Sequence, residues 1–180
     1  GMASGVESSA DVTLNEAALR MMYTGPCQVA AKAMQECAAG AMILAAASTF
    51  TLAAEEQLSA ELLALHMGSH CLDEGDRADP LYQLLPKPLV WRAAHFGPVR
   101  SVRTTSWGCL QAPWGDAAVC FMHAVGYSLL EATDKQLARA SAAVYQGTAQ
   151  ELLYQAGGYM LESADGLLLV AFNRPARAAR

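Results

Sequence analysis

Apolar residues in the first half of the chain recur with two different spacings, one typical of a helix and one typical of a strand. Residues 27–39 carry apolar side chains on most helical faces, as a buried helix does, and Pro26 suits its first turn. Gly40 suits the position just after the end of that helix. Apolar residues at alternate positions in 62–72 instead predict a strand. The other elements predicted here are a strand over 41–44, a helix over 51–58, and a strand over 80–85 that forms a hairpin with 62–72.

The second half combines strands with one long helix. Residues 117–123 (AAVCFMH) predict a buried strand, and Asp134 suits the N-cap of a helix over 135–155. Asp165-Gly166 predicts a hairpin turn, because this pair readily adopts positive φ angles. Its strands are expected over 159–162 and 167–172, and Pro175 begins a short final helix. The long helix is expected to bury one apolar face, formed by Leu137, Ala140, Val144, Leu152 and Leu153.

Two segments lack such spacing. Residues 1–19 begin small and polar and are expected to be flexible, with a short helix or a strand end around 14–22. Residues 87–115 hold all three tryptophans and four basic side chains without an acidic one. They predict an irregular connector with one strand near 99–103. Helices that cover strands therefore predict an α/β fold, built as an α+β sandwich.

Composition narrows the class of protein. Of 180 residues, 53% are hydrophobic and only 16% are charged, which argues against intrinsic disorder. The net charge of −5 disfavours a nucleic-acid binder, and no apolar run reaches the roughly 18 residues of a membrane span. The N-terminus lacks a basic-then-apolar export signal, so we expect a cytoplasmic protein without membrane contact. Its five cysteines form no CxxC pair and are expected to be reduced.

One stretch of the second half resembles a known family. Residues 157–172 (GGYMLESADGLLLVAF) are similar to the central hairpin of class III nucleotidyl cyclases, which typically reads GGYxVKTxGDxFMVAF. Residues 119–128 (VCFMHAVGYS) are similar to the first strand of that family, FxDIxGFT. The long helix predicted between them fits the same order. Residues 116–180 therefore resemble the first half of a cyclase domain.

The first half of the chain resembles the second half of the same domain. Residues 23–34, which begin YTGP, are similar to the family segment YxGxxxNxAARI. Residues 39–44 (AGAMIL) resemble its GGQIL strand. The closing hairpin of the family, LGxHxLK…LYQL, resembles residues 66–70 (HMGSH) and 80–84 (PLYQL). The resemblance thus extends over residues 20–86, with 87–115 as the connector.

The two halves stand in reversed order. Either the chain spans the end of one cyclase domain and the start of the next, or its halves pair with each other as a circular permutant, within one chain or across a dimer. The resemblance implies a ferredoxin-like sheet assembled from two half-domains in permuted order. Each half alone would expose sheet edges, so we expect the halves to pair.

The resemblance also identifies candidate metal ligands. Class III cyclases hold two metal ions on two aspartates, and these ions activate the ribose hydroxyl and neutralise the triphosphate. His123 occupies the first aspartate position. Gly166 occupies the second in an ungapped match, with Asp165 one residue earlier. Imidazole suits Mg²⁺ poorly, so no cofactor is expected unless the chain is active with Mg²⁺ or Mn²⁺.

The remaining family positions are also substituted. Val29 and Ala33 occupy the positions of the transition-state asparagine and arginine. Met22 and Glu162 occupy the purine-reading positions. Since electrostatic stabilisation is usually the largest catalytic contribution, the resemblance implies lost turnover.

Two further sets of residues attract attention outside the resemblance. His66, His70 and Cys71 form a cluster that could hold zinc on a helix. On the predicted strand, the two histidines share one face about 13 Å apart, which is too far for one ion. The three tryptophans predict either a binding surface or cover for the core.

Three functions follow from these observations. The first is a catalytically degenerate cyclase homology module that serves dimerisation and regulation in cyclic-nucleotide signalling, with itself or another cyclase domain as partner. The second is a divergent cyclase that uses His123 and Asp165. The third is a domain that binds a purine nucleotide without converting it.

Overall fold

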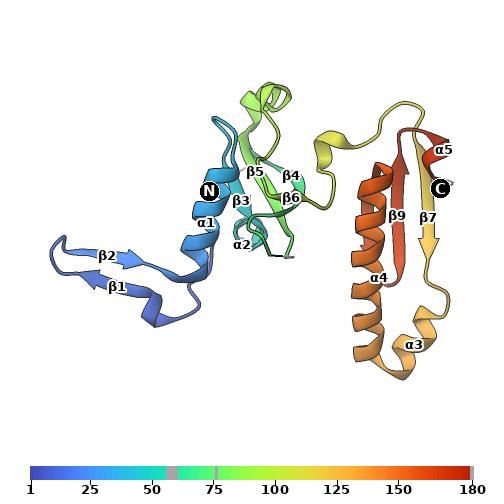
Figure 1. Cartoon of the computed structure of the whole chain (residues 1–180), viewed down its shortest axis with the longest axis horizontal. Helices are drawn as coiled ribbons and strands as arrows, with labels where there is room; N and C mark the ends of the chain where they lie inside the picture. Colours follow the sequence, from blue (N-terminus) through green and yellow to red (C-terminus); the bar gives the residue numbers. More distant parts are fainter. Residues whose placement is uncertain (56–60, 76, 179–180) are drawn as a thin grey trace. The chain divides into compact units, whose positions relative to one another are not determined.

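The chain divides into two compact units in a computed structural model, which describes residues 1–55, 61–75 and 77–178. Unit 1 spans Gly1–Thr104 and unit 2 spans Thr105–Arg180. Their division falls inside the segment 87–115 that the sequence analysis assigns to a connector. Both units combine helices with small antiparallel sheets, so the protein is a mixed α and β protein (Figure 1).

Unit 1 is built on a four-stranded antiparallel sheet. The strand order is β3-β5-β4-β6, with bounds Leu44–Ala46, Asp79–Pro86, Leu62–Cys71 and Arg103–Thr104. The predicted hairpin is confirmed as β4 and β5. The predicted strand near 99–103 reduces to the two residues of β6, which pair with the end of β4.

Two helices accompany this sheet. Helix α1 spans Gly25–Cys37, and its residue Met34 packs with Leu44 and Leu81 in the core of unit 1. Gly40 was expected to end this helix, but the helix stops at Cys37, with Ala38 in extended conformation. Helix α2 spans Ala47–Glu55, so it begins four residues before its predicted start. Residues 56–58 of that prediction lie outside the described residues.

The first residues of the chain make specific contacts. Strand β1 (Val12–Asn15) follows a 3₁₀ turn at Ser9–Asp11 and pairs with β2 (Arg20–Tyr23). Met2 forms a parallel bridge to Ala45 at the outer edge of β3. These contacts differ from the flexible segment expected over 1–19, because long-range backbone hydrogen bonds join a stretch whose composition alone favours no element.

Unit 2 is a three-stranded antiparallel sheet with one long helix packed against it. The order is β7-β9-β8, with bounds Ala118–His123, Leu167–Phe172 and Gly158–Ala164. Helices α3 (Tyr127–Thr133) and α4 (Lys135–Ala156) connect β7 to β8, and α5 (Pro175–Ala178) follows β9 (Figure 1). The predicted strands and helices of this half are confirmed. The strand over 117–123 was expected to be buried, which is wrong, because in β7 exposed side chains alternate with half-buried ones.

Local signals explain the ends of these elements. The Asp134 carboxylate accepts hydrogen bonds from the backbone N–H groups of Gln136 and Leu137, both at 3.0 Å, which confirms it as the N-cap of α4. Gly157 ends α4 in left-handed conformation. Asp165 and Gly166 both have positive φ angles, 49° and 75°, as the β8–β9 turn requires.

Helix α4 buries a different face from the one expected. Its buried residues are Ala138 and Leu153, and Leu153 packs against Leu168, Val170 and Phe172 of β9. The expected apolar face is wrong for four of its five members, because only a narrow part of the helix contacts the sheet. The members that remain exposed are Leu137, Ala140, Val144 and Leu152.

The connecting segments contain short 3₁₀ turns at Lys87–His95 and Cys109–Gln111. All five cysteines are free thiols. None of the helices in the described part of the chain combines the length and hydropathy needed to cross a bilayer.

Candidate functional site

The two candidate metal ligands lie at the same end of the unit 2 sheet. His123 is the last residue of β7 and pairs with Leu167, the first residue of β9. Asp165 lies two residues before Leu167, in the β8–β9 turn. The backbone N–H of Ala124 donates to the carbonyl of Gly166 at 2.8 Å and closes this end of the sheet.

Both of these side chains are exposed to solvent. Over the described residues, no group of three or more His, Cys, Asp or Glu side chains lies close enough to hold a metal ion. An exposed imidazole beside one turn carboxylate offers two ligands at most. This pair is therefore a poor fit for the two-metal chemistry that the family requires.

The substituted family positions divide between the units. In unit 1, Met22 lies on β2 and Val29 and Ala33 lie on α1, where Val29 is 65% exposed. In unit 2, Glu162 is exposed on β8, beside the irregularity that separates Met160 from Glu162. The three side chains of unit 1 offer neither charge nor strong hydrogen-bond donors. They can line a surface but cannot stabilise a transition state.

A β-bulge separates the two histidines that the sequence places on one face. Between His66 and Ser69 the β4–β5 register shifts, and Gly68 has a φ of 95°. His66 consequently pairs with Tyr82, whereas His70 pairs with Asp79, which belongs to the opposite face of β5. The prediction that the two histidines share one face is therefore wrong, because the extra residue of the bulge reverses side-chain direction.

His70 has a structural role in unit 1. It is 4% exposed, and its Nε2–H donates to the carbonyl of Met67 at 3.0 Å. Its Nδ1 then accepts from the hydroxyl of Ser101 at 2.8 Å, with the Thr104 hydroxyl at 3.3 Å. Burial lowers the pKa of His70, and the hydrogen bond to Met67 offsets part of that shift. A neutral, fully bonded ring leaves no free nitrogen for a metal.

The buried cysteine of α1 is also unsuited to catalysis. Cys37 is 6% exposed, and burial together with the neighbouring Glu36 carboxylate raises the pKa of its thiol. A raised pKa keeps the thiol protonated, so it is a weak nucleophile at neutral pH. Cys27 donates its S–H to the carbonyl of Ala3 at 3.1 Å. Both thiols thus belong to the packing of α1.

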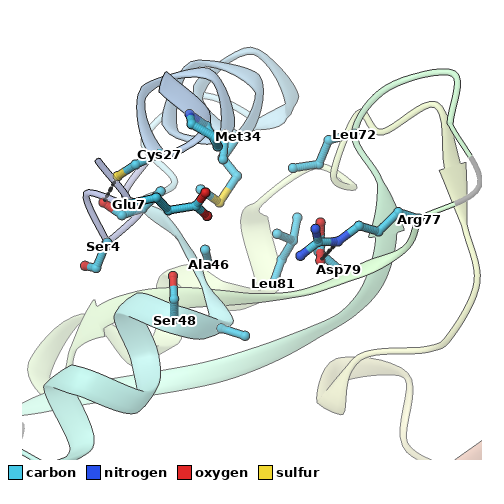
Figure 2. A pocket seen from close by; sticks show the side chains of 15 residues that line it. Ser4, Glu7, Cys27, Met34, Ala46, Ser48, Leu72, Arg77, Asp79 and Leu81 are labelled. Carbon is cyan, nitrogen blue, oxygen red and sulfur yellow. Dashed lines mark hydrogen bonds and ion pairs between the residues drawn. The ribbon is translucent and has the colours of Figure 1, made fainter. Parts of the chain in front are cut away.

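Unit 1 contains a cavity of 330 Å³ that no sequence motif marks (Figure 2). Met34 of α1 and Leu81 of β5 contribute apolar side chains to its wall. Arg77 and Asp79 form an ion pair on another part of the wall, with 3.0 Å between Nε and Oδ1. The Glu7 carboxylate comes from the N-terminal segment. Glu7 is distant in the sequence from Arg77 and Asp79, so local spacing gives no signal that these three residues share a cavity.

Comparison of the chain with protein-family models, with curated proteins and with solved structures gives no match.

Proposed function

We propose that the chain is a catalytically degenerate nucleotidyl cyclase homology module that pairs with another cyclase-type half-domain and acts in dimerisation and regulation. The observation that carries this proposal is the open edge of the unit 2 sheet. Strand β7 pairs only with β9 among the described residues, so its other edge has no partner strand. With β9 in the centre and β7 as an open edge strand, unit 2 has the split β-α-β arrangement of ferredoxin-like sheets and can accept one more strand beside β7.

Side chains on β7 support pairing at this edge. Val119 is 55% exposed and Phe121 is 73% exposed, and the strand carries no Lys, Arg, Asp or Glu side chain. Natural sheet edges are usually protected by charges, prolines or covering elements. An uncharged edge strand with exposed apolar side chains instead favours addition of another strand.

Loss of catalysis is the second part of the proposal. The family's metal, transition-state and base-reading positions hold residues that cannot replace the original groups. Small antiparallel sheets compatible with the resemblance, together with substitution at these positions, favour a role in pairing over turnover. A partner half-domain would complete the sheet, and regulation would follow from whether that partner is bound.

The replacement Phe121→Lys tests the pairing part. It places a charge on the open strand at an exposed position, so the fold of unit 2 should persist. We expect the dissociation constant of the self-associated chain, or of its complex with an active cyclase domain, to rise by about tenfold or more in sedimentation equilibrium.

Val144→Lys is the matched control, because Val144 is 70% exposed on α4 rather than on β7. This control should leave association unchanged. Equal association of wild type and Phe121→Lys, or a monomeric wild-type chain that binds no cyclase domain, would contradict the pairing proposal.

A further inference from the structure

A second cavity lies in unit 2. The cyclase resemblance assigns no role to any of its lining residues. Its volume is 360 Å³, and it is lined by two indoles and two carboxamides, those of Trp107, Trp114, Gln111 and Asn173. Gly157, at the C-terminal end of α4, also lines it. The cavity therefore forms where the 105–115 segment meets the ends of α4 and β9.

Part of this site is held in place by neighbouring groups. The Trp107 ring lies 4.6 Å from the Tyr154 ring of α4, centroid to centroid, at an interplanar angle of 39°. The Gln111 Oε1 accepts a hydrogen bond from the backbone N–H of Gly108 at 3.1 Å. This bond fixes the carboxamide and leaves its NH₂ group as a donor. One wall of the cavity is thus preorganised.

The other wall carries an unusually exposed tryptophan. Trp114 is 89% exposed, and its ring contacts no other aromatic ring in the described part of the chain. Tryptophan is normally buried in large part, and exposed aromatic side chains beside polar groups mark binding sites. The indole is therefore available to cover a ligand that enters from solvent.

We propose that this cavity binds a neutral saccharide. A pyranose ring presents an apolar C–H face that packs on an indole and hydroxyls that both donate and accept hydrogen bonds. The carboxamides of Gln111 and Asn173 offer the same two functions. Gly157 caps the C-terminal end of α4, which carries partial negative charge, so this end of the cavity disfavours anions.

The same chemistry argues against two other ligands. None of the lining residues is charged, so a phosphate group would lose water without gaining a cationic partner. A proline-rich peptide also packs on aromatic grooves, but proline has no N–H and offers chiefly acceptors. Such a peptide would leave the carbonyl oxygen of the Asn173 side chain without a donor. The proposal is independent of the proposed cyclase-type function.

The test uses the full chain on an array of soluble mono- to tetrasaccharides, followed by titration of retained sugars with tryptophan fluorescence. We expect at least one neutral saccharide to bind. Trp114→Ala should lower the affinity for that saccharide by about tenfold or more, because a central aromatic contact is removed. Asn173→Ala should lower the affinity for the same saccharide by a smaller factor. The matched control is Trp91→Ala, which removes a tryptophan that is 62% exposed in unit 1 and should leave affinity unchanged.

Three results would overturn the proposal. One is failure of every saccharide on the array to bind the folded chain. Another is equal loss of affinity in Trp114→Ala and Trp91→Ala. The third is binding of proline-rich peptides in place of sugars at the same tryptophan.

Discussion

Replacement of Leu168 by alanine is expected to lower the free energy of unfolding of unit 2 by about 2–5 kcal/mol. Leu168 is 1% exposed on β9 and packs with Leu153, Val170 and Phe172 beneath α4. Truncation removes apolar contacts and leaves a cavity that a sheet covered on one side by a single helix cannot readily refill. The core of unit 2 is small, so this loss is a large share of its stability.

Leu161→Ala is the matched control, because Leu161 has the same side chain and is 50% exposed on β8. We expect Leu161→Ala to lower the free energy of unfolding by well under half as much as Leu168→Ala does. Urea unfolding followed by fluorescence, in a Trp91→Phe background, reports on unit 2 alone, where the other two tryptophans lie. Equal losses for both variants would show that the described packing of β9 is wrong.

Replacement of Gln83 by methionine is expected to raise the free energy of unfolding of unit 1 by about 1–3 kcal/mol. Gln83 is fully buried on β5, and neither its Nε2 nor its Oε1 has a hydrogen-bond partner among the described residues. Its pairing partners on the neighbouring strands are Leu44 and Leu65. An unpaired amide in apolar surroundings is costly, and methionine matches its length without polar atoms.

Gln28→Met serves as the control, since Gln28 is exposed on α1. Glutamine and methionine have similar helix propensity, so this replacement should not alter the helix itself. Its effect should lie within about 0.5 kcal/mol of zero. Chemical unfolding monitored through Trp91 measures both variants in unit 1. If Gln83→Met destabilises the unit, the amide has a partner in solution, and the expectation fails.

Elements with local signals could be predicted from the sequence. The Asp134 cap, the long helix after it and the Asp165-Gly166 turn all follow from neighbouring residues, because capping and positive φ depend on short-range chemistry. The buried face of α4 could not be predicted, since nearly all its faces carry alanine or leucine. Pairing with the sheet, a long-range contact, decides which of them is covered.

The candidate site shows the same division. The Asp165-Gly166 pair correctly predicts the β8–β9 turn, because its signal is local. The pairing of His123 on β7 with Leu167 is a long-range contact and has no such signal. The bulge at Gly68, which separates His66 from His70, has no such signal beyond the glycine itself. Both cavities combine residues distant in the chain. Composition could therefore indicate the tryptophans of the unit 2 cavity but not their neighbours, and it offers no signal for the unit 1 cavity.

Production of cyclic AMP and cyclic GMP by the purified, folded chain is the measurement that tests the degenerate-module proposal most directly. With ATP or GTP and Mn²⁺ we expect no turnover, alone or after His123→Ala, because Val29 and Ala33 stand where the proposed resemblance places the transition-state asparagine and arginine. Turnover by the wild-type chain that His123→Ala removes would contradict the proposal. It would identify the protein as a divergent cyclase with a metal site at the end of β7.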